Sequence, residues 1–447
     1  MAARLPSMRR SAARLLTALL TALPLTLPVA LSPARASASS PDPARTEVTF
    51  QGGDGLTLHG TVLEPAGHHD ALPGIVLIGG GGPGPREDYL PEAQAFARAG
   101  IATLVYDKRT TGYSTLHRDF GLLADDAAAG LEVLRSHPGV RPGAVGLWGF
   151  SEGGWVAPLV ANRSTDAAFV ITIGGPGLTP LRTQLWGLDT HLAHRGAPAS
   201  LRRAVDGPFT RLLGAAGVFP EGEHDPLPAL DHLRQPVLAL WGEHDGIVPP
   251  KESAEIFRRE LAGAGNEHAT IGFVPGAGHT GRRTTDGVDG PGYLDAMTAW
   301  TSQVVEGRPP RSTTAEPPAQ TVASRATNTG PWYESAPVQW AAGLLILVGF
   351  LGGALEQRGR VARWLCGLGT ATVVGAPAYV AFVFATNAES TGVELLWRLL
   401  QATAVTVVAL TATLAATAWR TRTAPPALLA AGALFVPWAL SWRLVPA

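Results

Sequence analysis

One serine in this sequence stands between two glycines: Ser151 lies between Gly149 and Gly153 in the segment GFSEGG. A serine hydroxyl becomes a nucleophile when a base takes its proton, and that base needs a carboxylate to orient it. Two later segments carry such groups, Asp245 in WGEHDGIVP and His279 in PGAGHTG. Serine, aspartate and histidine in this chain order form a known triad arrangement. We therefore predict Ser151 as nucleophile, Asp245 as acid and His279 as base.

Neighbouring residues offer alternatives for the acid and the base. Glu243 precedes Asp245 by two positions and could replace it as the carboxylate, while His244 could be the base. His244 comes before the acid in the chain and follows a different predicted strand from His279, so the chain order favours His279. Glu243 stays open as an alternative acid.

Acyl transfer also requires backbone N–H groups that bind the negative charge on the acyl oxygen. We expect one donor at Glu152, directly after the serine, and the other in the loop GGGGPGPRED at residues 79–88, where Gly80 or Gly81 is the best candidate. This loop lacks the G-K-[ST] ending of a phosphate-binding loop and does not open a helix as G-x-G-x-x-G. We therefore predict neither a nucleotide nor any other cofactor. A metal site is not predicted either, and the single cysteine excludes a Cys-based zinc site.

Each candidate residue follows a predicted strand. AVGLW before Ser151 is typical of a buried strand and WVAPLVANR after it of a helix, which predicts a sharp strand-to-helix turn that needs small neighbours. PVLALW precedes Asp245, and HATIGFV precedes His279. Similar strands alternate with helices over residues 46–305, which predicts an α/β domain with a doubly wound, mostly parallel sheet. The candidate residues should then share the carboxyl edge of that sheet.

A long segment separates the strands that end near residue 173 and begin near 237. At about sixty residues it exceeds what a simple crossover needs. Two stretches in it have helical character, so we predict a small helical cap at about residues 178–232. A pair of ordinary packing helices is the alternative.

Composition indicates a membrane protein with more than one structural unit. The chain has 447 residues and a net charge of -1, which gives no basic field for nucleic acid, so no nucleic-acid partner is predicted. Only 16% of its residues are charged, and its mean hydropathy is +0.13. After a Pro/Thr/Ser-rich segment at 306–336, predicted as an extended linker, four apolar stretches have about the length of membrane spans, at roughly 337–355, 362–385, 395–419 and 425–442.

The two ends of the chain predict how it lies in the membrane. Residues 1–38 have the basic start, apolar centre and A-x-A pattern of an export signal peptide, with an uncleaved anchoring helix as the alternative. The loop EQRGRVAR after the first span and RTRTA after the third carry arginines, whereas TNAESTG between them has none. By the positive-inside rule the α/β domain lies outside the cytoplasm. The predicted location is the cell membrane, multi-pass, with anchoring as the favoured role of the spans.

Five segments together resemble the α/β-hydrolase superfamily: LIGGGGPGPRED, YDKRTTGYS, GFSEGG, WGEHDGIVP and PGAGH. The sequence is most similar to bacterial esterases and serine-peptidase-like members related to dienelactone hydrolases and acylaminoacyl-peptidase catalytic domains. The resemblance covers about residues 46–305 and implies the same triad. Two positions depart from the pattern, a glycine where many relatives have His-Gly and Thr111 where they usually have glycine. The apolar tail is not part of the pattern.

These observations predict an extracytoplasmic, membrane-anchored serine hydrolase that cleaves acyl esters through an acyl-enzyme. The predicted partners are a small-molecule or peptide acyl substrate and the membrane itself. A serine aminopeptidase or acyl-peptidase and a cell-envelope acyltransferase are the enzymatic alternatives. A membrane protein whose hydrolase-like ectodomain only binds is the alternative from another class.

Overall fold

The computed structural model describes residues 42–445, except 68–70, 220, 282–292, 328, 356–358, 389–391 and 422–425. The predicted signal peptide, residues 1–38, lies outside this part of the chain. Two compact units are distinguished, and the second, Pro41–Ala447, contains every element described below.

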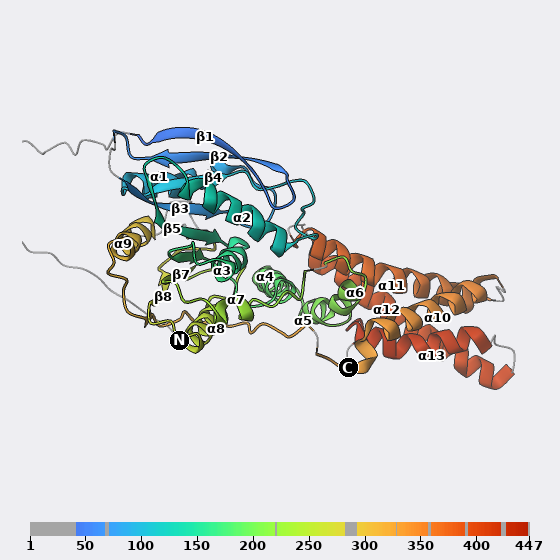
Figure 1. The fold of residues 1–447 in the computed structure, drawn as a ribbon. Coiled ribbons are helices and arrows are strands. Elements are labelled where there is room, and N and C mark those ends of the chain that lie inside the picture. Colours follow the sequence, from blue (N-terminus) through green and yellow to red (C-terminus); the bar gives the residue numbers. More distant parts are fainter. Residues whose placement is uncertain are drawn as a thin grey trace, which may run out of the picture. The chain divides into compact units, whose positions relative to one another are not determined.

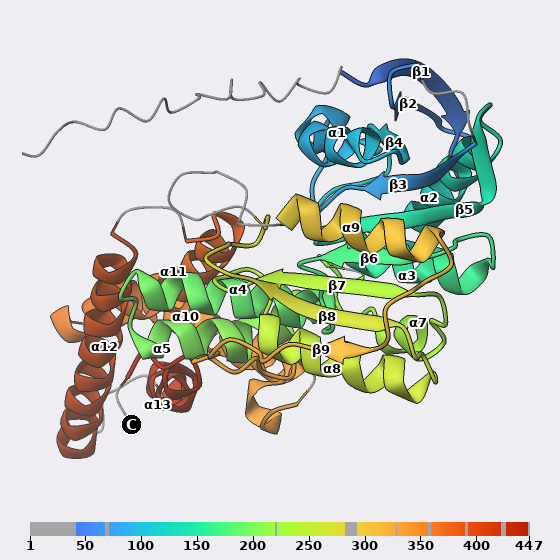
Figure 2. The same cartoon turned by 90° about the vertical axis from the view of Figure 1, so that its left-hand side faces the viewer.

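Within the described residues, nine strands form one sheet in the order β1-β2-β4-β3-β5-β6-β7-β8-β9 (Figures 1 and 2). β2 pairs antiparallel with β1 and β4, and the other neighbours are parallel. The predicted α/β class with a mostly parallel sheet is confirmed. The strands are β1 Ala44–Gln51, β2 Thr57–Glu64, β3 Leu72–Ile78, β4 Ala102–Tyr106, β5 Val140–Phe150, β6 Val170–Ile173, β7 Val237–Gly242, β8 Ala269–Val274 and β9 Thr313–Thr314.

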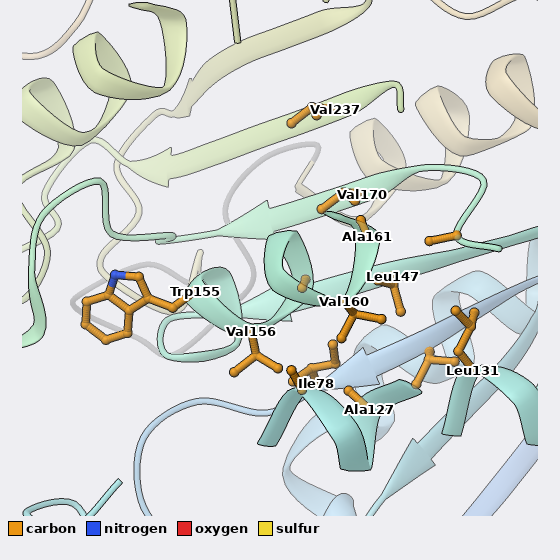
Figure 3. Close-up of a cluster of buried hydrophobic side chains, with 14 of the residues drawn as sticks. Ile78, Ala127, Leu131, Leu147, Trp155, Val156, Val160, Ala161, Val170 and Val237 are labelled. Carbon is orange, nitrogen blue, oxygen red and sulfur yellow. The ribbon is translucent and has the colours of Figure 1, made fainter. Parts of the chain in front are cut away.

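Helices cover both faces of the sheet, which explains why its central strands are apolar throughout. One face packs against α2 (Phe120–Arg135), α3 (Gly153–Arg163) and α8 (Pro250–Gly263), and the other against α1 (Leu90–Arg98) and α9 (Tyr293–Val305). A short η1 helix (Arg86–Tyr89) precedes α1. Figure 3 shows part of the first layer, where α3 places Val156 and Val160 near Ile78 and Leu147 of the strands. This packing holds the turn that precedes α3.

Strand β3 marks the point where the sheet changes its direction of growth. It pairs with β4 on one side and with β5 on the other. In open α/β sheets, ligands bind beyond the carboxyl ends of the strands at such a switch point. The glycine-rich loop follows β3 and Ser151 follows β5, so the topology brings the two to the same place.

The segment between β6 and β7 is helical, and we call residues 178–232 the cap. It contains α4 (Pro180–His194), α5 (Ala199–Ala204), η2 (Val205–Phe209), α6 (Thr210–Ala215) and α7 (Leu227–Asp231). Its leucines Leu188, Leu192 and Leu201 belong to the same hydrophobic cluster as Trp397 and Trp442 of the C-terminal helices. The apolar side of the cap therefore packs on those helices.

The segment predicted as an extended linker is tied to the sheet and to the cap. Its β9 strand pairs with β8 at the sheet edge. Farther along, the Trp186 indole Nε1–H donates to the Val322 carbonyl over 2.7 Å, and Arg182 Nε donates to Ser324 Oγ over 2.8 Å. We call residues 315–331 the strap. Its composition did not indicate these contacts.

Four apolar helices follow: α10 (Ala336–Leu355), α11 (Arg360–Ala385), α12 (Val393–Thr421) and α13 (Pro426–Ser441). A short η3 helix (Trp332–Glu334) precedes them. They pack against one another as a bundle (Figure 1). Three are long and apolar enough to cross a membrane, at Ala336–Leu355, Arg360–Ala385 and Val393–Arg420. The fourth predicted span corresponds to α13, a shorter apolar helix of 16 residues.

Exposed tryptophans lie near the ends of the long helices. Trp340 near the start of α10, Trp364 near the start of α11 and Trp419 at the end of α12 are 63%, 60% and 89% exposed. Tryptophan is enriched where helices cross the two surfaces of a membrane, because its ring is apolar and its N–H is polar. Their positions fit a bundle that spans a bilayer.

Candidate active site

The turn that carries Ser151 is strained, and glycines make it possible. Ser151 has a φ of 51°, in the left-handed region, and its amide donates to the Ile173 carbonyl over 2.8 Å. A Cβ at Gly149 would lie 2.1 Å from the Gly153 carbonyl oxygen, and one at Gly153 would lie 2.4 Å from that of Ile78. Larger residues at either position would push the turn apart. The two glycines thus allow the serine to stand at the sheet edge.

The structure brings Ser151, His279 and Asp245 into one hydrogen-bonded chain. His279 Nε2 lies 2.9 Å from Ser151 Oγ, and His279 Nδ1 lies 2.8 Å from Asp245 Oδ2. The other Asp245 oxygen accepts the amides of Ile247 and Val248, each over 2.9 Å. The Asp245 side chain is fully buried. These bonds fix the carboxylate, which in turn fixes the imidazole against the serine hydroxyl.

The alternative acid and base lie elsewhere. The Glu243 carboxylate is exposed and accepts the Gly276 amide over 2.8 Å. His244 is also exposed, and its backbone amide donates to the Ala277 carbonyl. In the described part of the chain no hydrogen bond joins either side chain to Ser151 or His279.

The glycine-rich loop approaches the serine. Hydrogen bonds of this loop distinguish between Gly80 and Gly81, its two predicted oxyanion donors. A Cβ at Gly80 would lie 3.5 Å from Ser151 Cβ. The Gly80 amide, however, donates to the Tyr89 hydroxyl over 2.7 Å. Among the described residues, the amides of Gly81 and Glu152 meet no acceptor. Of the two predicted loop donors, only Gly81 is thus available, because the Gly80 N–H is already used.

A buried charge cluster lies directly behind this loop, and the sequence did not predict it. The Glu152 side chain, 2% exposed, is paired with Lys108 and with Arg118, whose Nε lies 2.7 Å from Glu152 Oε2. Burial lowers the pKa of Lys108, an effect that the nearby Glu152 carboxylate opposes. Burial and the same carboxylate raise the pKa of Tyr113. A charged residue directly after Ser151, in an otherwise apolar segment, was the signal available in the sequence.

Sequence comparisons agree with this architecture. Residues 91–308 match the model of the prolyl oligopeptidase family. An uncharacterized protein of Mycobacterium tuberculosis, Rv2307c, is 30% identical over 255 residues, which cover 56% of this chain and 78% of that protein. The chain therefore belongs to the α/β-hydrolase superfamily, and its sheet order and strained serine turn agree with this.

Other similar proteins align over smaller parts. The polyketide transferase ATR5 of Stachybotrys chlorohalonatus is 32% identical over 133 residues, 28% of this chain and 43% of that protein, so the chain spans less than half of its length. Among solved structures, puromycin hydrolase is 24% identical with a TM-score of 0.42, covering 59% of this chain and 40% of the other. Dienelactone hydrolase from Anabaena variabilis is 20% identical with a TM-score of 0.38, covering 60% and 100%.

Proposed function

We propose that this protein is a membrane-anchored serine hydrolase that cleaves acyl esters. The observation that carries the proposal is the chain of hydrogen bonds from Asp245 through His279 to Ser151, on a turn that places the hydroxyl at the sheet edge. A serine with a purely structural role would not need a strained backbone, nor an imidazole placed between its hydroxyl and a buried carboxylate. This arrangement is the one that nucleophilic acyl transfer requires.

The geometry supports a two-step reaction. Ser151 Oγ attacks the acyl carbon while its proton passes to His279 Nε2, and the negative charge on the acyl oxygen is met by the amides of Gly81 and Glu152. His279 then gives the proton to the leaving alcohol, and an acyl ester of Ser151 remains. A water molecule, deprotonated by His279, attacks this ester, and His279 then returns the proton to Ser151 Oγ as the carboxylic acid is released. Asp245 keeps the imidazole oriented and stabilises its charged form.

Contacts between the cap and the bundle support the proposed direction of the bundle in the membrane. The end of the bundle that contacts the cap includes Ala388 after α11, whose carbonyl accepts Arg195, and Trp397 near the start of α12, which donates to Ser200. The arginines Arg360 and Arg363 lie at the start of α11 and so belong to the opposite end. A basic end away from the hydrolase domain is what the positive-inside rule requires if that domain lies outside the cytoplasm.

Peptide hydrolysis is the second candidate, because the matching family model is named for an oligopeptidase. Acyl transfer is a third, since relatives such as ATR5 are named polyketide transferases. All three use the same acyl-enzyme and differ only in the leaving group or in what accepts the acyl group from Ser151.

The test compares wild type with Ser151→Ala, both full-length and in detergent. Substrates are p-nitrophenyl butyrate, an aminoacyl p-nitroanilide, and the ester with an added alcohol as acceptor. The proposal predicts ester turnover by wild type and none above background by the variant. Faster release from the anilide would favour the peptidase, and formation of the new ester would favour the transferase. Equal turnover by wild type and variant would contradict all three.

A further inference from the structure

Both neighbours of Gly81 in the glycine-rich loop are held by side chains. The Gly80 carbonyl accepts Lys108 Nζ over 2.6 Å, and the Gly80 amide donates to Tyr89. On the other side, the Gly82 amide donates to the Tyr113 hydroxyl over 2.9 Å. The Gly81 peptide is therefore fixed from both directions, while its own N–H meets no acceptor among the described residues.

Lys108 and Tyr113 are joined to each other and to one carboxylate. Lys108 Nζ donates to the Gly80 carbonyl, to the Tyr113 hydroxyl over 2.9 Å and to the Glu152 carboxylate. The Tyr113 hydroxyl donates to Glu152 over 2.7 Å and accepts from Lys108 and the Gly82 amide. All three protons of the ammonium group and the full capacity of the hydroxyl are used. Two buried side chains that are hydrogen-bonded in this way have little freedom to rearrange.

Glu152 connects this network to the serine. Its backbone follows Ser151, and its amide is the other proposed oxyanion donor. Its carboxylate holds the two side chains that hold the loop. Glu152 thus supplies one N–H group and fixes the position of the other, which comes from a segment about seventy residues away. This matters because an oxyanion hole works only when both donors reach the same point.

We propose that Lys108 and Tyr113, anchored on the Glu152 carboxylate, are positioning residues that aim the Gly81 amide at the acyl oxygen. This rests on the proposed hydrolase function. In the described residues neither side chain is hydrogen-bonded to Ser151 or His279. Each acts through the loop, so its loss weakens binding of the transition state more than binding of the substrate.

The experiment uses Tyr113→Phe and Lys108→Met in the full-length protein, with p-nitrophenyl butyrate as substrate. Tyr113→Phe removes only the hydroxyl, and Lys251→Met on the exposed surface of α8 is the matched control for loss of a lysine. Loss of a whole oxyanion donor costs about 100- to 1,000-fold, so a misplaced donor should lower kcat about 10- to 100-fold with KM changed less than about threefold. Lys108→Arg, which keeps a cation, should restore part of kcat.

A trifluoromethyl ketone separates positioning from a general loss of structure. The ketone adds to Ser151 and places an oxyanion in the proposed hole, so its Ki should rise in parallel with the loss of kcat/KM. Unchanged kcat in Tyr113→Phe and Lys108→Met would overturn the proposal. So would a lower kcat with unchanged Ki for the ketone. Failure of the hydrolase function itself is distinct, because wild type would then be inactive.

Discussion

Two buried carboxylates in this protein are each paired with two cations, but they hold different things together. Glu152 pairs with Lys108 and Arg118 within the sheet domain, beside the serine. Glu334, just before α10, pairs with Arg211 of the cap helix α6 and with Arg443, which follows α13. Their side chains are 2% and 5% exposed. A buried carboxylate between two cations thus occurs at the proposed active site and also where the cap meets the bundle.

The difference lies in what each cluster positions. Lys108 and Tyr113, which contact the Glu152 carboxylate, also bond backbone atoms of the glycine-rich loop beside Ser151. The contacts of Glu334 join three elements, and none of its cations bonds to the loop or to Ser151 in the described residues. A buried ion pair is costly to break wherever it lies, because the remaining charge loses its partner. We therefore expect damage at Glu152 to appear in activity and damage at Glu334 to appear mainly in stability.

The largest effect is expected within the triad itself. His279→Ala removes the base, so kcat should fall by about 10⁴-fold or more. His244→Ala is the matched control, because His244 is exposed and should keep kcat within about twofold of wild type. Steady-state hydrolysis of p-nitrophenyl butyrate measures both. A larger loss in His244→Ala than in His279→Ala would overturn the assignment of the base.

The direct test of the comparison pairs Glu152→Gln with Glu334→Gln. Each change keeps the size of the side chain and removes its charge from between two cations. Glu152→Gln should lower kcat at least about tenfold, because the side chains that hold the Gly81 amide in place lose their anchor. Glu334→Gln should keep kcat within about twofold while the free energy of unfolding falls by about 2–3 kcal/mol.

Both variants, Glu152→Gln and Glu334→Gln, are compared with wild type by thermal unfolding, by limited proteolysis of the strap and by ester hydrolysis. Faster cleavage of the strap is expected in Glu334→Gln. If both variants lost activity equally at equal stability, the two clusters would not have separate roles.

A pH series should affect stability at the cap. Burial, with Asp189 nearby, raises the pKa of Asp206 to about 7, while Arg325 of the strap and Arg202 act in the other direction. Its pKa in the unfolded chain is about 3.9. The folded protein therefore binds this proton more tightly, and the contribution to stability is lost as the pH rises from about 4 through 7.

Asp206→Asn should remove that part of the pH dependence. Between pH 5 and pH 8 the melting temperature of wild type should fall more than that of the variant. The pH profile of ester hydrolysis should be the same in both, since Asp206 lies in the cap and not in the triad. An equal fall in melting temperature would show that Asp206 does not titrate in this range.

The smallest expected effect is at one hydrogen bond between cap and bundle. Ser200 Oγ accepts Trp397 Nε1 over 2.9 Å and Gln401 Nε2 over 3.2 Å. Ser200→Ala should cost about 1 kcal/mol of stability and leave kcat unchanged. Ser136→Ala, at an exposed helix end, is the control and should change neither quantity. No loss of stability in Ser200→Ala would mean that packing alone joins cap and bundle.

The sequence predicted the parts of the site that depend on local patterns. Ser151, Asp245 and His279 each follow an apolar strand, and parallel strands end at one edge, so chain order and strand ends were enough to bring them together. The alternation of strands and helices likewise predicted the fold class. These features are patterns of a few neighbouring residues, so they can be recognised without knowing which distant residues are in contact.

Features that depend on distant side chains were not predictable in the same way. Nothing near Glu152 in the chain indicates that Lys108 and Tyr113 meet its carboxylate, and Glu334 lies 123 positions from its partner Arg211. The choice between Gly80 and Gly81 also depended on a hydroxyl from Tyr89 that competes for one amide. Composition predicted an extended linker at residues 306–336 and contains no information on what that segment contacts.

If Ser151 is an activated nucleophile, it should react covalently with a fluorophosphonate probe. Membranes that contain the full-length protein are treated with the probe, and the modified peptide is identified by mass spectrometry. We expect one covalent adduct, on Ser151, which is absent in Ser151→Ala and strongly reduced in His279→Ala. A folded wild type that remains unlabelled, or an adduct on another residue, would contradict it.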